Sequence, residues 1–223
     1  MAYEVPEFHP AFEEYCETIF ELAEDSVEVI QARIAERLDV SRPAVSEMIR
    51  RLEREGLVRL DGNVIRLTAE GTALAISVVR RHRIAERFLT DVLGLSWTTA
   101  HHEAGKWEHV ISPQVEEALM RVLDDPTTCP HGNPIPGSEY TAPRDATALN
   151  ELDAGSRFVV RRIPEELEFR DGMLEFLESS AILPGNRGTV TAISPDGTLT
   201  VEIEGAHVGV GSYASERILV SNG

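Results

Sequence analysis

The sequence predicts a mainly α-helical N-terminal part that contains a winged helix-turn-helix, followed by a helical domain and a small β-barrel at the C-terminus. From Pro10 to Ile111, apolar residues recur every three or four positions, which is the period of an amphipathic helix. From Gly155 onward, short runs of alternating apolar and polar residues are separated by tight turns, which is typical of small β-barrels. The 223 residues are enough for two or three small domains.

Three helices are expected at the N-terminus. Residues 10–23 and 29–38 each place apolar side chains on one helical face, and glutamates occupy the rest of the first helix. The third helix begins after Ser41, a good N-cap, accepts Pro43 in its first turn and ends at Gly56. Helix, turn and helix in this order predict a DNA-binding motif.

A hairpin and two more helices follow. The short strands 57–60 and 64–67 are joined by Asp61-Gly62-Asn63, which is a strong hairpin signal. Thr68 caps a long helix that Gly94 ends, and another helix is expected from about Thr98 to Ile111. Residues 130–137 and the segment up to Ala154 are rich in turn residues and are interpreted as a linker. Five short strands and one helix, 167–179, make up the C-terminal part.

The composition is that of a globular protein, with 42% apolar and 26% charged residues. No apolar run approaches the roughly 20 residues that cross a membrane, and the acidic start does not resemble a signal peptide. Cys16 and Cys129 are too few for a disulfide framework. We therefore expect a cytoplasmic protein that does not interact with membranes.

A net charge of −17 argues at first against nucleic-acid binding. Between Arg33 and Arg66, however, arginines slightly outnumber carboxylates. Either the chain contacts no phosphate backbone, or its positive charge is local and part of the acidity binds cations; the segregation of charge favours the second interpretation.

The second helix of a helix-turn-helix enters the major groove, where its N-terminal residues reach base edges and nearby arginines hold phosphates. Such a motif binds as a homodimer to two half-sites of double-stranded operator DNA. The alternative is a helical bundle whose hairpin serves only protein contacts. The candidate DNA-binding residues are Arg33, Ser41, Arg42, Pro43, Ala44, Ser46, Glu47, Arg50, Arg51 and Arg59, with Arg66 as a further phosphate contact.

Metal-ligand types recur at helical spacing in three segments. Imidazole and carboxylate groups without thiolate suit a divalent first-row ion. Each pair also has a simpler explanation, as a solvated helix face, a surface pair or a buried hydrogen bond, and spacing does not separate His101 from His102. The candidates are Glu14 and Glu17, then His82 and Glu86, and then His101, Gly105, Glu108 and His109.

Four stretches make the chain resemble the diphtheria toxin repressor and iron-dependent regulator family, which has manganese-responsive members. They are ARIAERLDVSRPAVSEMIRRLEREGLV, RRHRIAERFLTDVLGL, EAGKWEHVISPQVE and PTTCPHGNPIPG. The resemblance implies a metal-dependent repressor without enzymatic activity or organic cofactor, and an SH3-like C-terminal domain. The implied parts are residues 1–74 for DNA binding, 75–140 for metal binding and dimerisation, 141–154 as linker and 155–223 as the SH3-like domain.

The resemblance also implies two metal sites per subunit. The ancillary site is expected to use His82, Glu86, His101, Glu165 and Glu168, and the primary site Glu14, Glu108, His109 and the Gly105 carbonyl, with Glu17 or water completing it. Iron-sensing members have methionine at the position of Glu14 and cysteine at that of Gly105, whereas manganese-responsive members have carboxylates at both.

Oxygen ligands remove the preference of sulfur ligands for Fe(II), so we predict Mn(II) as the activating metal, with Fe(II) as the alternative. Two rival functions are a small metallohydrolase, for which no HExxH motif exists, and a winged-helix regulator of an organic ligand. Apolar candidates for the dimer interface are Phe88, Leu89, Val92, Leu93 and Trp97.

Overall fold

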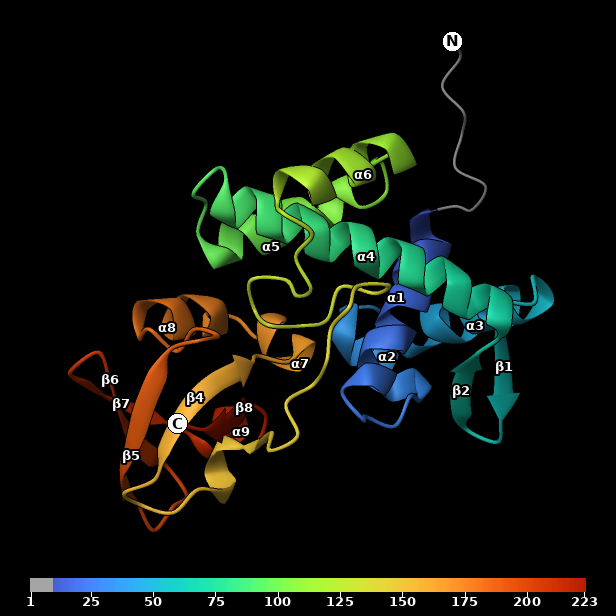
Figure 1. Cartoon of the computed structure of the whole chain (residues 1–223). Coiled ribbons are helices and arrows are strands. Elements are labelled where there is room, and N and C mark those ends of the chain that lie inside the picture. Colours follow the sequence, from blue (N-terminus) through green and yellow to red (C-terminus); the bar gives the residue numbers. More distant parts are fainter. Residues whose placement is uncertain (1–9) are drawn as a thin grey trace.

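The computed structural model describes residues 10–223, which form a helical part and a sheet part, with the short helix α7 (Glu165–Glu168) lying between them (Figure 1). The first nine residues of the predicted DNA-binding domain lie outside the described residues. The chain around residues 130–147 passes between the two parts (Figure 1). No helix in the described range has the length and apolar character needed to cross a bilayer.

The N-terminal unit consists of three helices and a hairpin. They are α1 (Pro10–Glu24), α2 (Gln31–Arg37), α3 (Arg42–Arg54), β1 (Val58–Asp61) and β2 (Val64–Leu67). The two strands pair antiparallel, with Val58 opposite Leu67. The Ser41 hydroxyl accepts a hydrogen bond from the Ala44 amide, as expected of an N-cap. The helix-turn-helix and its hairpin wing therefore have the predicted order.

The core of this unit is the apolar face predicted for each helix. Ile19, Ile34, Ile49 and Leu52 are all nearly inaccessible to solvent. The glutamates occupy the rest of α1, as expected, but they are not all exposed, and Glu17 is among those that are buried. The periodicity does not predict this, because it marks only the apolar contacts of a helix.

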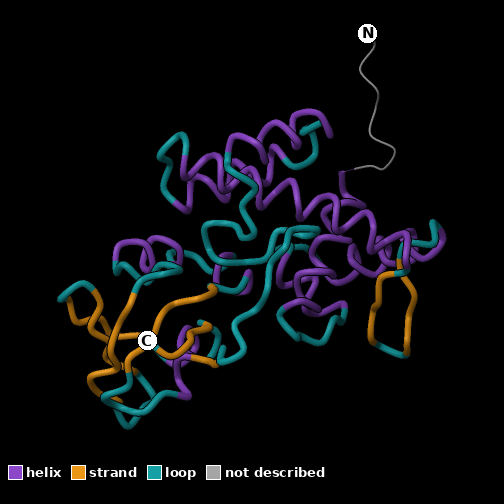
Figure 2. The backbone as a smooth tube through the Cα atoms, viewed as in Figure 1, coloured by secondary structure: helices purple, strands orange, loops and turns teal. Residues whose placement is uncertain are grey.

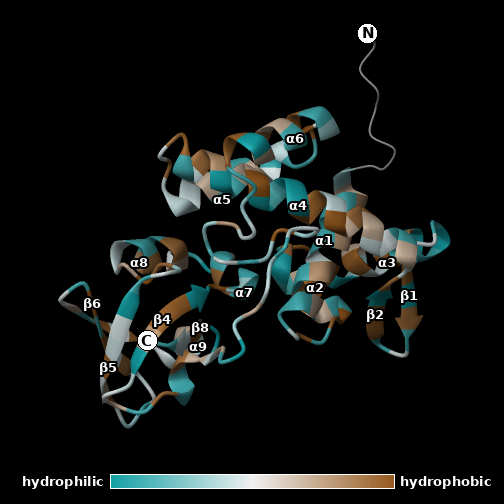
Figure 3. Cartoon of the chain, in the orientation of Figure 1, coloured by the Kyte–Doolittle hydropathy of each residue, from teal (hydrophilic) through white to brown (hydrophobic). Residues whose placement is uncertain are grey.

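Three helices make up the middle of the chain: α4 (Ala69–Asp91), α5 (Trp97–Trp107) and α6 (Pro113–Val122). Hydrophobic and hydrophilic residues alternate around them, as in amphipathic helices (Figure 3). The Thr68 side chain caps α4 by accepting from the Gly71 amide, as predicted. Helix α5 ends earlier than expected, and α6 was not predicted, although Ser112 followed by proline is a helix-start signal.

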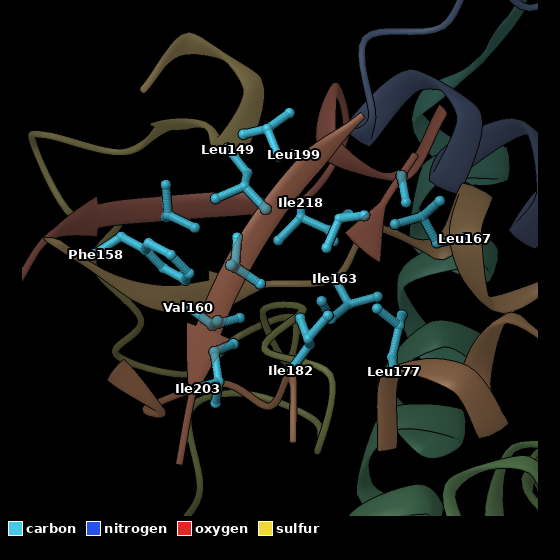
Figure 4. Packing of buried hydrophobic residues seen from close by; sticks show 14 of the residues in the cluster. Leu149, Phe158, Val160, Ile163, Leu167, Leu177, Ile182, Leu199, Ile203 and Ile218 are labelled. Atoms are coloured by element: carbon cyan, nitrogen blue, oxygen red, sulfur yellow. The ribbon is translucent and has the colours of Figure 1, made fainter. Parts of the chain in front are cut away.

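The C-terminal part is one antiparallel sheet with the strand order β3-β8-β4-β5-β6-β7. Its strands are the orange segments around the C-terminus in Figure 2. Its core is built from Phe158, Val160, Leu199, Ile203 and their neighbours (Figure 4). The pairing among described residues leaves β3 and β7 as edges, so it gives a sheet without showing the closure of a barrel. The strands are β3 (Thr147–Ala148), β4 (Arg157–Arg162), β5 (Arg187–Ile193), β6 (Leu199–Ile203), β7 (Ala206–Val210) and β8 (Leu219–Asn222), with α9 (Ser212–Ser215) before the last.

The single helix predicted over residues 167–179 is wrong. The structure has two helices, α7 (Glu165–Glu168) and α8 (Met173–Ser179). Gly172 separates them, with a φ of 72° that the interior of a right-handed helix does not allow. This break sets α7 apart from the sheet and places it against the helical part (Figure 1).

The segments interpreted as linker are more ordered than expected. Residues 147–151 form β3 and a 3₁₀ turn, and Leu149 is buried in the core of the C-terminal sheet. Upstream, the loop 129–135 is packed between the two parts, and its His131 carbonyl accepts from the Ile163 amide. A Cβ on Gly132 would lie 2.2 Å from the Arg161 carbonyl oxygen, so the close approach requires glycine.

Candidate metal centre

Negative charge is concentrated where the helical part meets α7. Burying so many carboxylates is costly unless cations or protons compensate them. Within the described residues, the buried glutamates are Glu13, Glu17, Glu21, Glu86, Glu108, Glu165 and Glu168.

A first group joins the N-terminal unit to the middle helices. It consists of Glu17 from α1, His82 from α4 and Glu108, which follows α5, with one ligand atom from each within 4.8 Å of the others. His82 Nδ1 lies 2.5 Å from Glu108 Oε2. All three side chains are buried, so this group is not an ordinary exposed acidic patch.

A second group shares His82 with the first. His82 Nε2 lies 3.2 Å from Glu86 Oε1, one turn along α4. His101 Nδ1 is 2.9 Å from the same oxygen and 3.3 Å from Glu168 Oε2 on α7. The C-terminal part therefore supplies a carboxylate to the same cluster, as the resemblance implied for Glu168.

A third group contains two residues that were not among the predicted ligands. Glu86, Cys129 and His131 bring one donor atom each to within 4.8 Å, and all three are buried. His131 Nδ1 is 2.8 Å from Glu168 Oε2. The sequence did carry a signal, because cysteine and histidine two positions apart are both ligand types. The interpretation of this stretch as linker concealed it.

Several nitrogen and oxygen atoms in these groups that could bind a metal have no hydrogen-bond partner. Buried polar atoms are normally satisfied, and those that are not need an explanation such as an ion. Both ring nitrogens of His131 make no hydrogen bond despite the short ion-pair distance to Glu168. Carboxylate oxygens without a hydrogen bond are Glu17 Oε1, Glu86 Oε2 and Glu165 Oε2, whereas Glu168 Oε2 lies within ion-pair distance of His101 and His131. The donor set and its unused atoms fit divalent cations.

The histidines are surrounded by enough negative charge to hold protons. Burial alone would lower the pKa of His82, but Glu86 and Glu108 raise it well above its usual value. Burial also opposes protonation of His101, yet hydrogen bonds to Glu168 and Glu86 raise its pKa to about 9. For Glu17, burial and the Glu108 charge raise the pKa well above the normal carboxyl value. These pKa shifts show that the cluster attracts positive charge, which a proton or a cation can supply.

The residues predicted for the primary site line one cavity of about 310 Å³, but they do not all touch one another. Glu14 is exposed at its rim. His109 Nδ1 lies 2.6 Å from Glu13 Oε2, a partner that was not predicted, and its Nε2 is 3.3 Å from Glu108 Oε1. Gly105 and Glu17 line the same cavity.

Two predicted ancillary ligands are placed differently. Glu168 contacts His101 and His131, whereas Glu165 is held by Arg83, whose Nη2 is 3.0 Å from Glu165 Oε1. Burial and the charge of Glu168 raise the pKa of Glu165 to about 7. Of the two adjacent histidines on α5, His101 lies in the cluster and His102 is exposed.

Most of the predicted DNA-binding residues are exposed, although Arg33 pairs with Glu36 and the Arg51 guanidinium carbon lies 5.2 Å from the centroid of the Phe12 ring. Arg42, Pro43, Ala44, Glu47 and Arg50 are all exposed at the start and along one side of α3. Ser41 is also exposed, and Ser46 is partly so. Arg33, Arg51 and Arg59 are exposed nearby, and Arg66 pairs with Asp61 across the wing.

The apolar candidates for the dimer interface divide into two sets. Val92 and Leu93 are about half exposed at the end of α4. Leu89 and Trp97 are buried within the chain, and Trp97 packs into the core of the C-terminal part. Trp97 is therefore a poor candidate for contact with a partner subunit, because residues of its own chain already bury its side chain.

Three family models match the chain in order. They are described as the N-terminal DNA-binding domain of iron-dependent repressors (residues 7–63), the metal-binding and dimerisation domain of iron-dependent repressors (68–137) and the FeoA domain (147–222).

Known proteins of similar sequence include the iron-dependent repressor IdeR of Mycobacterium leprae, 45% identical over 204 residues, which covers 86% of this chain and 88% of the relative. The diphtheria toxin repressor of Corynebacterium efficiens is 40% identical, covering 88% of each chain. A solved structure of a manganese-dependent transcriptional repressor in complex with manganese is 34% identical, has a TM-score of 0.83, and covers 95% of this chain and 99% of its own.

All three similar proteins are named as repressors and none as an enzyme. The DNA-binding model ends before α4. The metal-binding and dimerisation model begins at the residue that caps α4. Since the sequence similarity to curated repressors also extends over most of the chain, this protein belongs to the iron-dependent repressor family that includes the diphtheria toxin repressor.

Proposed function

We propose that this protein is a transcriptional repressor that binds operator DNA as a homodimer when Mn(II) is bound. The observation that carries the proposal is the first group of ligands, in which Glu17 of the DNA-binding unit meets His82 and Glu108 of the middle helices. A cation held by these three residues would connect the two units directly. In its absence, the clustered carboxylates repel one another or bind protons.

The ligand assignment follows the buried groups. One centre uses Glu17, His82 and Glu108, with Glu14, His109 and the Gly105 carbonyl around the same cavity. A second centre uses the residues around Glu86. They are His101, Glu168, His131 and Cys129, with Glu165 as a further candidate because its Oε2 has no partner.

The choice of Mn(II) rests on the first centre, whose donors are oxygen and nitrogen only. Such donors lack the thiolate that favours Fe(II) over Mn(II). The IdeR relatives are named iron-dependent, whereas a structural neighbour is named manganese-dependent, so Fe(II) is the alternative. Cys129 in the second centre is a softer ligand, which suits Fe(II) or Zn(II) better than Mn(II).

Bound metal supplies positive charge that offsets carboxylate repulsion and ties α1 to α4 and α5. The protein's own residues then position the DNA-binding surface. Helix α1 packs against α2 and carries Glu17, and the exposed start of α3 presents Arg42, Pro43 and Ala44 to the major groove. In a dimer, a fixed angle between the two units sets the spacing of the two α3 helices, which must match one helical turn of DNA.

The division of the chain into residues 1–74, 75–140, 141–154 and 155–223 is part of this proposal. We assign the C-terminal sheet to an SH3-like barrel that supplies Glu168 to the second centre. We expect a regulator of this kind to act on DNA in the cytoplasm. A winged-helix regulator of an organic ligand predicts instead that metal and operator affinity are independent.

Operator binding by the wild-type protein is expected to strengthen at least about tenfold on saturation with Mn(II), because one site with a tenfold preference for the DNA-competent state contributes that factor. Fluorescence anisotropy measures it, with a duplex selected from a random library by the Mn(II)-loaded protein. Equal affinity after exhaustive chelation contradicts the repressor mechanism. Activation by Fe(II) at far lower free concentration than Mn(II) contradicts the manganese assignment only.

Mn(II) affinity is expected to rise with pH between about 6 and 8, by up to about tenfold per pH unit for each displaced proton. The reason is that only the neutral ring binds metal, and the pKa of His101 is raised to about 9, so protons must leave throughout this range. Calorimetry in two buffers of different ionisation enthalpy counts the protons released. A pH-independent affinity without proton release argues against histidine ligation.

A further inference from the structure

Arg37 occupies an unusual position in the helix-turn-helix. It lies at the last residue of α2, directly before the turn that leads to α3. Its side chain is only 5% exposed, whereas that of Arg33, one turn earlier on the same helix, is 53% exposed. An arginine in a DNA-binding motif that points into the protein does not contact phosphate, so its charge serves another purpose.

Two contacts hold this side chain. Arg37 Nη1 lies 3.5 Å from Glu21 Oε2 on α1, and the Glu21 side chain is equally buried. The guanidinium carbon lies 4.2 Å from the centroid of the Phe169 ring, which directly follows α7. Arg37 thus joins α2 to both the first helix and the C-terminal part.

Both partners of Arg37 border the metal cavity. Glu21 and Phe169 line the cavity that contains His82 and Glu108. The Phe169 ring is also edge-to-face with His101, with centroids 5.2 Å apart. Glu21 is four residues after Glu17 on α1, so the two carboxylates lie on one side of that helix. A change in the position of His101 or Glu17 therefore reaches Arg37 through one intervening side chain.

Other polar links between this motif and the rest of the protein are few. Among the described residues, the remaining ion pair of α2 is Arg33 with Glu36 on the same helix, and no ion pair joins α3 to another element. Arg37 Nη2 has no hydrogen-bond partner, so the guanidinium can accept a further contact when its partners move. Because guanidinium pairing and stacking both depend on geometry, small shifts of the partners change the interaction strongly.

We propose that Arg37 is a positioning residue that couples the metal centres to the helix-turn-helix. Its partners Glu21 and Phe169 lie next to Glu17 of the first ligand group and His101 of the second, so they move with those groups. This inference rests on the proposed function and adds to it the route by which α2 and α3 respond. The side chain binds neither the metal nor the operator. It aligns α2 with the cavity wall, so its removal uncouples metal binding from DNA binding without removing either.

The test measures a coupling factor, which is the operator dissociation constant under chelation divided by that at saturating Mn(II). Using the full chain and the selected duplex, Arg37→Met and Phe169→Leu are each expected to lower this factor by about tenfold, within the range for residues that carry coupling between sites. The Mn(II) binding isotherm is expected to stay within about twofold of wild type, as the ligands are intact. The double variant should lose no more than either single one, because both residues act through one contact.

Two matched variants control for general damage. Phe169→Tyr keeps the ring and is expected to retain the wild-type coupling factor. Arg33→Met removes an exposed charge from the same helix and is expected to weaken DNA binding equally with and without metal. If Arg37→Met does not fold, Phe169→Leu decides alone, since Phe169 is 47% exposed.

Wild-type coupling in both Arg37→Met and Phe169→Leu would overturn the inference and leave the repressor mechanism standing. A large loss of Mn(II) affinity in Arg37→Met would also overturn it, since Arg37 would then act on the metal site itself. Absence of any coupling in the wild-type protein would refute the proposed function and this inference with it.

Discussion

The variant His82→Ala is expected to lose Mn(II)-dependent operator binding, so that the gain in DNA affinity on adding metal, at least about tenfold in the wild-type protein, disappears. His82 is the residue that the first and second ligand groups share. Its Nδ1 faces Glu108 and its Nε2 faces Glu86. Alanine at this position removes a ligand atom from both the first and the second group. Any other single substitution in these two groups leaves one of them complete.

Folding of His82→Ala must be separated from its metal response. Without metal, the variant lacks a buried imidazole whose pKa is raised by two carboxylates, and its unfolding midpoint under chelation shows the structural cost. His102→Ala is the matched control, because His102 is exposed and belongs to none of the three ligand groups. A normal Mn(II) response in His82→Ala, or its loss in His102→Ala, would show that the metal is held by other residues.

Substitution of Arg83 by methionine is expected to destabilise the metal-free protein by about 3–5 kcal/mol, the cost of leaving the buried Glu165 carboxylate without its cation. Arg83 has no solvent exposure. Its guanidinium pairs with Glu24 of α1 at 2.6 Å and with Glu165 of α7 at 3.0 Å, and it donates to the Pro134 carbonyl. One side chain therefore ties together the N-terminal unit, the buried loop and the C-terminal part.

Thermal or denaturant unfolding in the presence of a chelator measures this effect, which corresponds to a fall in Tm on the order of 10 °C. Arg87→Met, one turn further along α4, is the control. Arg87 is partly exposed and, among residues 10–223, forms an ion pair only with Asp91, so its substitution should cost about 1 kcal/mol or less. A small effect for Arg83→Met, equal to that of Arg87→Met, would mean that the three parts are held together by other contacts.

Further polar contacts beside Arg83 explain why the C-terminal part packs closely against the end of α1. Arg162 of β4 pairs with Asp25 at 2.6 Å, beside the Glu24 carboxylate that Arg83 also contacts. The amide of Glu166 donates to the other oxygen of Asp25. The end of α1 is thus bound to the C-terminal part by polar contacts, so that α7 can place Glu168 beside His101 and His131.

Much of the fold follows from short stretches of sequence. The third helix begins where Ser41 and Pro43 predict and buries Ile49 and Leu52 as its periodicity requires. Thr68 caps α4 by accepting a hydrogen bond from the Gly71 amide, as its position before the helix predicts. Caps, turns and helical periods are set by residues a few positions apart, and a single sequence contains that information.

The tertiary structure alone decided the composition of the metal centre. Cys129 and His131 lie in the third ligand group because their loop is packed between the helical part and the sheet part, and Glu165 faces Arg83 although it is one turn from Glu168. The stripe of ligand types on α4 and α5 was visible in the sequence, but which groups meet was not. Convergence of charges from distant segments depends on how the domains pack and on where burial forces each charge to find a partner, and no local period records either.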